Sequence, residues 1–161
     1  MDDLFKIGDN IVYPMHGAGI IEAIEDKEVL GEIQQYYVIK MPINNMQVMI
    51  PIKKISTSRI RRVVDKLVLE NVLDIFHFGE SDRSMTWKER YKSNMEKMKT
   101  GQIQEGAEVV RDLMRINKEK ALNTSEKQML DNARRIFVSE MGLIKGITDI
   151  QATDFLNAKI S

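Results

Sequence analysis

Apolar and polar residues alternate along the first third of the chain with the two-residue period of β-strands. Four such stretches are rich in β-branched or aromatic residues and are separated by turn residues. They are residues 11–13, 19–25, 35–41 and 46–51. All three prolines fall here, at positions where they can end strands, because proline cannot donate to a ladder. The pattern predicts a small N-terminal β-barrel.

After about Ser58 the apolar positions recur every three or four residues, which is the period of an amphipathic helix. This spacing predicts four helices and a short fifth. They cover residues 62–78, 85–99, 102–119, 127–144 and 149–157. The predicted fold class is therefore α+β, with a β-barrel module over residues 1–58 followed by an all-helical module over residues 59–161.

The composition supports a folded protein in a reducing compartment. Of 161 residues, 43% are apolar and 30% charged, close to the globular average. The chain has no cysteine, which excludes a disulfide framework, a thiolate metal site and a cysteine nucleophile. No apolar run approaches the roughly 20 residues of a membrane helix. We therefore expect a cytoplasmic protein without membrane association.

The formal net charge is zero, but the charges are unevenly distributed. Residues 1–58 carry five basic and eight acidic side chains, a net charge of −3, so the remainder carries +3. Most of that excess lies between Arg83 and Arg135, where 13 basic residues face 8 acidic ones. The helical module is thus the part of the chain that can attract nucleic acid, although only weakly.

Residues that could support catalysis or bind a metal are scarce. The only two histidines, His16 and His77, stand at neither a metal-ligand nor a catalytic-triad spacing. The glycines at positions 17 and 19 lack both phosphate-loop patterns and indicate a turn. We predict no catalytic residues, no metal, no cofactor and no enzymatic activity.

The single tryptophan, Trp87, stands at the start of a predicted helix with Lys88, Arg90 and Lys92 close by. An exposed indole among cations could wedge into a base step from the minor groove while the cations bind phosphates. Alternatively, Trp87 anchors the helix end in the core, and the cations form a solvated face. These residues taken alone favour the core alternative.

Other basic residues have open roles. Arg59, Arg61 and Arg62 lie at the module junction, where they meet either phosphate or the acidic barrel. Arg111 and Arg115 stand four residues apart on a predicted helix. They belong either to a solvated face paired with carboxylates or to a basic patch shared with the cations near the tryptophan.

Four segments, in order along almost the whole chain, resemble the CarD/CdnL family of bacterial transcription regulators. The first, FKIGDNIVYPMHGAG, resembles the opening motif of the family, and WKERYKSNMEK resembles its tryptophan-bearing helix. The segments are residues 5–19, 87–97, 107–113 and 122–130. The resemblance implies a Tudor-like or SH3-like barrel in residues 1–58 that interacts with RNA polymerase, and a helical DNA-binding module in residues 59–161.

This resemblance also implies a mechanism. The barrel would dock on the β subunit of RNA polymerase, and the helical module would contact promoter DNA with low sequence specificity. The family tryptophan, matched by Trp87, wedges into the minor groove at the upstream edge of the melted DNA and stabilises the open complex. Lys88 and Arg90 would be flanking DNA contacts. Lys127, at a helix start, would lie near the DNA backbone.

On the barrel, the resemblance assigns polymerase binding to Lys27 and Met49. The family often has arginine at the second position, so a charge-assisted contact worth about 1.5–3 kcal/mol where buried is absent here. From the residues alone, Met49 on an edge strand suits strand addition and ordinary packing equally. The competing hypothesis is a protein–protein adaptor with Trp87 in its core. We expect a monomer in solution.

Overall fold

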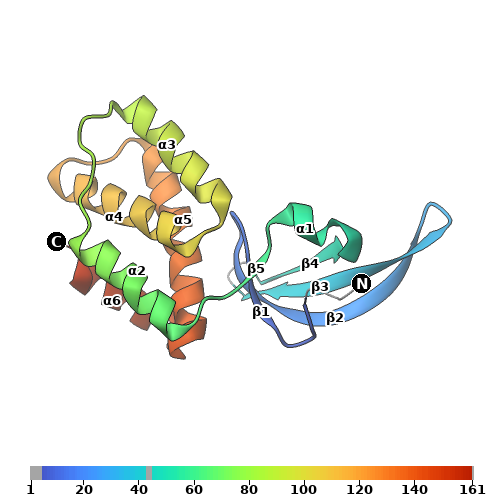
Figure 1. Cartoon of the computed structure of the whole chain (residues 1–161). Coiled ribbons are helices and arrows are strands. Elements are labelled where there is room, and N and C mark those ends of the chain that lie inside the picture. The colour runs from blue at the N-terminus through green and yellow to red at the C-terminus, as the bar shows by residue number, and fades with distance from the viewer. Residues whose placement is uncertain (1–4, 43–44, 161) are drawn as a thin grey trace.

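The computed structural model describes residues 5–42 and 45–160; the remaining positions of both predicted modules lie outside the described residues. A β-sheet and a group of helices lie side by side, and a single extended segment leads from one to the other (Figure 1). The predicted α+β class, with strands first and helices after, is confirmed.

Five antiparallel strands form one sheet in the order β4-β3-β2-β1-β5. Their bounds are β1 (Asn10–Tyr13), β2 (Gly17–Val29), β3 (Glu32–Met41), β4 (Met46–Pro51) and β5 (Arg61–Arg62). One face carries the core of the sheet, which includes Ile21, Tyr37, Ile39 and Ile50. The short helices η2 (Ile52–Lys54) and α1 (Ile55–Ser58) follow β4, and Ile55 joins that core.

Strands β2 and β3 extend beyond the predicted strands and form a long hairpin that projects from the sheet (Figure 1). The outer pairs, from Glu25↔Tyr36 to Val29↔Glu32, are mostly polar on both faces. No apolar alternation marks such a segment, and this is why the sequence did not predict it. Leu30 and Gly31 make the turn, with φ of 53° and 81°.

The sheet also continues past Ser58. Strand β5 pairs with β1 through Ile11↔Arg62 and Val12↔Arg61. The helix predicted to begin at Arg62 therefore begins at Lys66, where the Asp65 side chain caps it. The apolar spacing was misleading at this point, because the Val63 amide still bonds to the carbonyl of Asn10 in β1.

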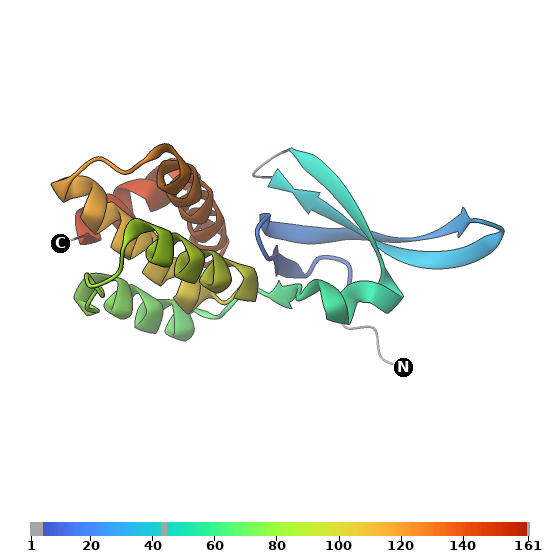
Figure 2. The ribbon, with the colours of Figure 1, turned by 90° about the horizontal axis from the view of Figure 1, so that it is seen from above.

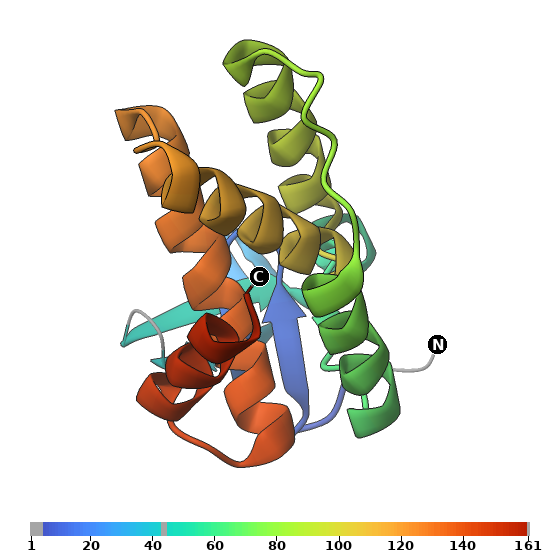
Figure 3. The same cartoon turned by 90° about the vertical axis from the view of Figure 1, so that its left-hand side faces the viewer.

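Five helices pack around the second core. They are α2 (Lys66–Phe78), α3 (Trp87–Thr100), α4 (Ile103–Glu119), α5 (Thr124–Lys145) and α6 (Asp149–Lys159). Helix α4 lies against α2, α3 and α5 (Figure 3). Near the centre, the rings of Phe76 and Phe137 are 6.1 Å apart. Within residues 5–42 and 45–160, no helix has the length and apolar character needed to cross a membrane.

The sheet and the helices lie next to each other (Figure 2), and partly buried polar contacts join the two modules. Arg61 in β5 donates from Nη1 and Nη2 to Glu140 of α5, both at 2.8 Å, and from Nε to the carbonyl of Gly101, also at 2.8 Å. Glu140 is 2% exposed and accepts a further bond from the amide of Val64. The Ala18 amide donates to the Ser139 hydroxyl. The modules are therefore held in one relative orientation.

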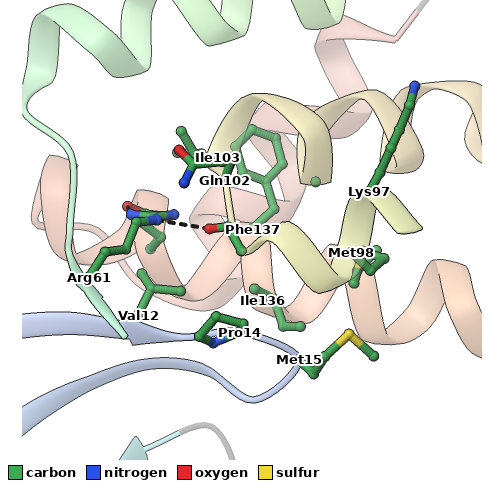
Figure 4. A pocket seen from close by; sticks show the side chains of 14 residues that line it. Val12, Pro14, Met15, Arg61, Lys97, Met98, Gln102, Ile103, Ile136 and Phe137 are labelled. Atoms are coloured by element: carbon green, nitrogen blue, oxygen red, sulfur yellow. Dashed lines mark hydrogen bonds and ion pairs between the residues drawn. The ribbon is translucent and has the colours of Figure 1, made fainter. Parts of the chain in front are cut away.

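The junction is also closely packed. Val12, Pro14 and Met15 face Met98 and the neighbouring helical side chains around a cavity of about 30 Å³ (Figure 4). That volume is about the size of one water molecule.

The junction arginines divide between the helical module and the sheet. Arg59 donates to the carbonyl of Lys99 in α3 at 3.3 Å, and Arg61 binds a carboxylate of the helical module, a partner that was not expected. Arg62 does meet the sheet: it contacts Asp9 at 3.3 Å and lies over the Phe5 ring.

Candidate nucleic-acid interface

Helix α3 begins at Trp87 and presents its indole to solvent. Thr86 caps the helix: its hydroxyl accepts from the Glu89 amide, and the Glu89 carboxylate accepts from the Thr86 amide. The hydrogen bond from the Thr86 amide, and after it the Thr86 hydroxyl, favour the charged carboxylate and lower the pKa of Glu89 below its ordinary value of 4.5. Trp87 is 45% exposed and lies outside the helical core, so the core alternative is wrong.

The indole lies beside a cation and a groove. The Lys88 ammonium is 5.9 Å from the centroid of the Trp87 ring, and its side chain is exposed. The groove runs between the start of α3 and the connection from α4 to α5; besides Trp87 it is lined by Arg90, Ile116, residues 120–123 and Glu126. Lys120 thus reaches the tryptophan site from a distant part of the chain, a proximity that the sequence pattern could not reveal.

Arg90 forms a largely buried ion pair. Its Nε and Nη2 atoms each donate to a Glu126 oxygen at 2.7 Å. The Arg90 side chain is 18% exposed, and that of Glu126 only 1%. The hydrogen bonds to Glu126 raise the pKa of Arg90. Arg90 was expected to contact DNA as a surface cation. In the structure, the Glu126 carboxylate instead occupies the Nε–Nη2 edge of its guanidinium.

Lys127 lies on the first turn of α5, next in the chain to Glu126, and is exposed. The pairing of Arg90 with Glu126 therefore brings together the starts of α3 and α5. Both starts lie at the same end of the helical module (Figure 3). Trp87, Lys88 and Lys127 consequently belong to one end of the protein, away from the sheet.

Arg111 and Arg115 are not part of this surface. Arg111 is buried and donates to Asp112 and to the carbonyls of Ile75 and Glu80. Arg115 donates to carbonyls at the end of α2 and just beyond it. Both arginines thus bind the negative end of the α2 dipole. Burial and the neighbouring Arg111 lower the pKa of Arg115.

The sheet brings the two predicted polymerase contacts onto one face. Lys27 pairs with Gln34 of β3, and Met49 of β4 pairs with Val38 of the same strand. Positions 34 and 38 of β3 point to the same side, opposite the core face that carries Tyr37. Met49 is half-buried, and β4 is an edge strand of the sheet, so its outer side has no partner strand in the described part of the chain.

Across residues 5–42 and 45–160, no three histidine, aspartate or glutamate side chains cluster as metal ligands.

Comparison with known proteins identifies the family of the chain. A family described as "CarD-like/TRCF RID domain" matches residues 5–64, and one described as "CarD, C-terminal domain" matches residues 71–157. A protein of Bacillus subtilis (strain 168), named "Putative transcription factor YdeB", is 66% identical over 152 residues, covering 94% of this chain and 99% of its own. The chain belongs to the CarD family.

CarD family membership makes the protein a transcription regulator with a Tudor-like N-terminal sheet, as the sequence predicted. The N-terminal domain of Myxococcus xanthus CarD, solved by NMR, is 29% identical and covers 36% of this chain and 77% of its own, with a TM-score of 0.32. That overlap is too limited to bear on the fold of the whole chain.

Proposed function

We propose that this CarD-family protein binds the β subunit of RNA polymerase through its sheet and stabilises the promoter open complex with Trp87. The indole would wedge into the minor groove at the upstream edge of the melted DNA. Lys88 and Lys127 would contact phosphates beside it. In this role the protein acts as a monomer in the cytoplasm, reaches the nucleoid through the polymerase, and carries out no catalysis.

The exposed indole carries this proposal. A solvated tryptophan at a helix start contributes little to the core of the helical module, yet it offers a flat apolar surface with an ammonium beside it. Apolar side chains that enter a base step from the minor groove act in this way, at an unstacking cost of a few kcal/mol offset by new contacts.

The modest basic excess of the helical module suits a tethered protein. Docking on polymerase supplies a high effective concentration, so weak and shape-dependent DNA binding is sufficient. The sheet offers the edge strand β4 and the face bearing Lys27 and Met49 for that docking. Edge strands are common sites of strand addition between proteins.

The adaptor hypothesis is the weaker one, because its distinguishing feature was a tryptophan in the core. Trp87 is exposed instead.

The decisive experiment replaces Trp87 with alanine and measures open-complex lifetime on a purified promoter. Stacking on a base is worth about 1–3 kcal/mol, so we expect the lifetime gain to fall roughly five- to 150-fold while polymerase binding persists. Phe78→Ala, which removes another exposed aromatic ring of the helical module, is the control. An unchanged lifetime with Trp87→Ala would refute the wedge.

Docking is tested separately with the isolated β subunit. We expect Lys27→Glu to weaken binding and Met49→Arg to strengthen it, since arginine restores the charge that the family often has there. If neither variant alters the affinity, this face of the sheet is not the docking surface.

A further inference from the structure

The buried ion pair between Arg90 and Glu126 connects the start of the tryptophan helix to the start of α5. Two parallel hydrogen bonds of 2.7 Å join the planar guanidinium to the carboxylate. The Glu126 amide is in turn held by the Asn123 side chain, which caps α5. We call Arg90 and Glu126, with these bonds, the clasp.

The clasp lies next to the indole, along the chain and in the groove. Trp87 and Arg90 are three residues apart, on neighbouring positions of one helix face. Both line the same groove, and Glu126 closes it from the α5 side. A change in the clasp is therefore expected to alter the orientation of the indole.

A phosphate contact through Nε and Nη2 of Arg90 would conflict with this burial. Turning these two atoms toward DNA would leave a carboxylate that is 1% exposed without its partner, and an unpaired buried charge is strongly unfavourable. A bidentate pair fixes the relative orientation of its two side chains in addition to balancing their charges. Lysine in place of arginine would keep the charge but not this orientation. The burial of the clasp therefore favours a structural role beside the site over a direct contact with DNA.

We infer that Arg90 is a positioning residue, which together with Glu126 holds Trp87 in its wedging orientation, and that it does not neutralise a DNA phosphate. This inference rests on the proposed function, and it reassigns the residue that the family resemblance put beside the DNA. The phosphate contacts then fall to exposed lysines such as Lys88.

Salt dependence separates the two roles. A side chain that neutralises one phosphate contributes about one unit to the slope of log affinity against log salt, whereas a positioning residue contributes none. The full-length chain is titrated into fluorescein-labelled fork-junction DNA, and anisotropy gives Kd at several salt concentrations. Lys88→Met is the matched control for a true phosphate contact.

Four variants of the clasp are compared with Lys88→Met. We expect Arg90→Met to weaken binding at least threefold with an unchanged salt slope, and Lys88→Met to lower the slope by about one. Arg90→Lys keeps the charge but should behave like Arg90→Met. Glu126→Gln should also weaken binding, although it removes a negative charge near DNA. The double variant R90M/E126L, which replaces the pair with apolar side chains, should return to within twofold of wild type.

The opposite pattern overturns the inference: a slope reduced by about one in Arg90→Met, near wild-type binding by Arg90→Lys, or tighter binding by Glu126→Gln. Circular dichroism checks that each variant folds. If a single variant fails to fold, the test rests on the double variant, whose apolar pair leaves no unpaired buried charge.

Failure of the proposed function is recognised separately. If Trp87→Ala binds fork-junction DNA like wild type, the proposed wedge is wrong. The positioning role of the clasp is then tested without DNA, by acrylamide quenching of Trp87 fluorescence in the free protein. A positioning role predicts that the quenching constant changes in Arg90→Met and Glu126→Gln and returns in the double variant. Unchanged quenching in both single variants would rule it out.

Discussion

The ion pair between Arg61 and Glu140 should couple the stabilities of the two modules. Arg61→Met leaves the Glu140 carboxylate buried with only the Val64 amide as donor. Removing one partner of a buried pair costs about 3–5 kcal/mol, and we expect a value near 3 because that one hydrogen bond persists. Glu140→Gln should cost less, about 1–2 kcal/mol, since the amide keeps an acceptor and Arg61 is partly reachable by water.

Urea unfolding gives these free energies. Trp87 fluorescence reports on the helical module, because it is the only tryptophan, and far-ultraviolet circular dichroism reports on both modules. The double variant R61M/E140L should unfold within about 1 kcal/mol of wild type, because an apolar pair leaves no buried charge without a partner.

The order of the two single variants is the sharpest part of this prediction. The more buried partner is the carboxylate, so its loss of a counter-ion should be the costlier event. If Glu140→Gln were the more damaging change, or if both variants lay within 0.5 kcal/mol of wild type, the junction would not depend on this ion pair as argued.

Three further perturbations test local geometry. Leu30→Asn should stabilise the protein by about 0.5–1 kcal/mol in urea, because asparagine tolerates the left-handed turn conformation that a 99%-exposed leucine occupies at φ 53°. Gly101→Ala should cost clearly more than Gly146→Ala: both glycines end helices at φ near 70°, but only at Gly101 would the added Cβ lie 2.5 Å from Pro14. The cap of α3 should weaken in acid, because folding lowers the pKa of Glu89. The ionised Glu89 therefore stabilises the folded protein fully above its unfolded pKa near 4.5, and this stabilisation is lost as the pH falls through its lower pKa in the folded protein. Indole emission against pH should show this step in wild type, and Glu89→Gln should lack it.

The helices were well predicted because their signals are local. Apolar spacing and end signals put α4 at residues 102–119 and α6 at 149–157, within two residues of the observed bounds at each end. The start of α2 was predicted four residues early, because Val63 fits the helical spacing although its amide bonds to the carbonyl of Asn10 in β1. Periodicity alone does not reveal that a stretch pairs with a strand distant in the sequence.

The contacts that organise the site were beyond prediction from the sequence. Arg90 and Glu126 are 36 positions apart, and Arg61 and Glu140 are 79 apart. Every surface helix carries many charged residues, so nothing in the sequence marks which of them pair in the interior. The charge pattern did identify the helical module as the basic one, but it counted buried cations such as Arg111 equally with exposed ones.

The two buried glutamates of α5 give the helix a structural role that neither ion pair shows alone. Glu126 and Glu140 are nearly four turns apart, so they lie on almost the same face and roughly 20 Å from each other. One holds the helix that begins with Trp87, and the other holds β5 of the sheet. Helix α3 spans a similar distance, from Trp87 to Gly101, whose carbonyl also binds Arg61. If the sheet docks on polymerase as proposed, a link of fixed length between sheet and indole would let the bound protein meet the DNA at one position only. For that reason, weakening either ion pair should shorten open-complex lifetime even where polymerase affinity is unchanged.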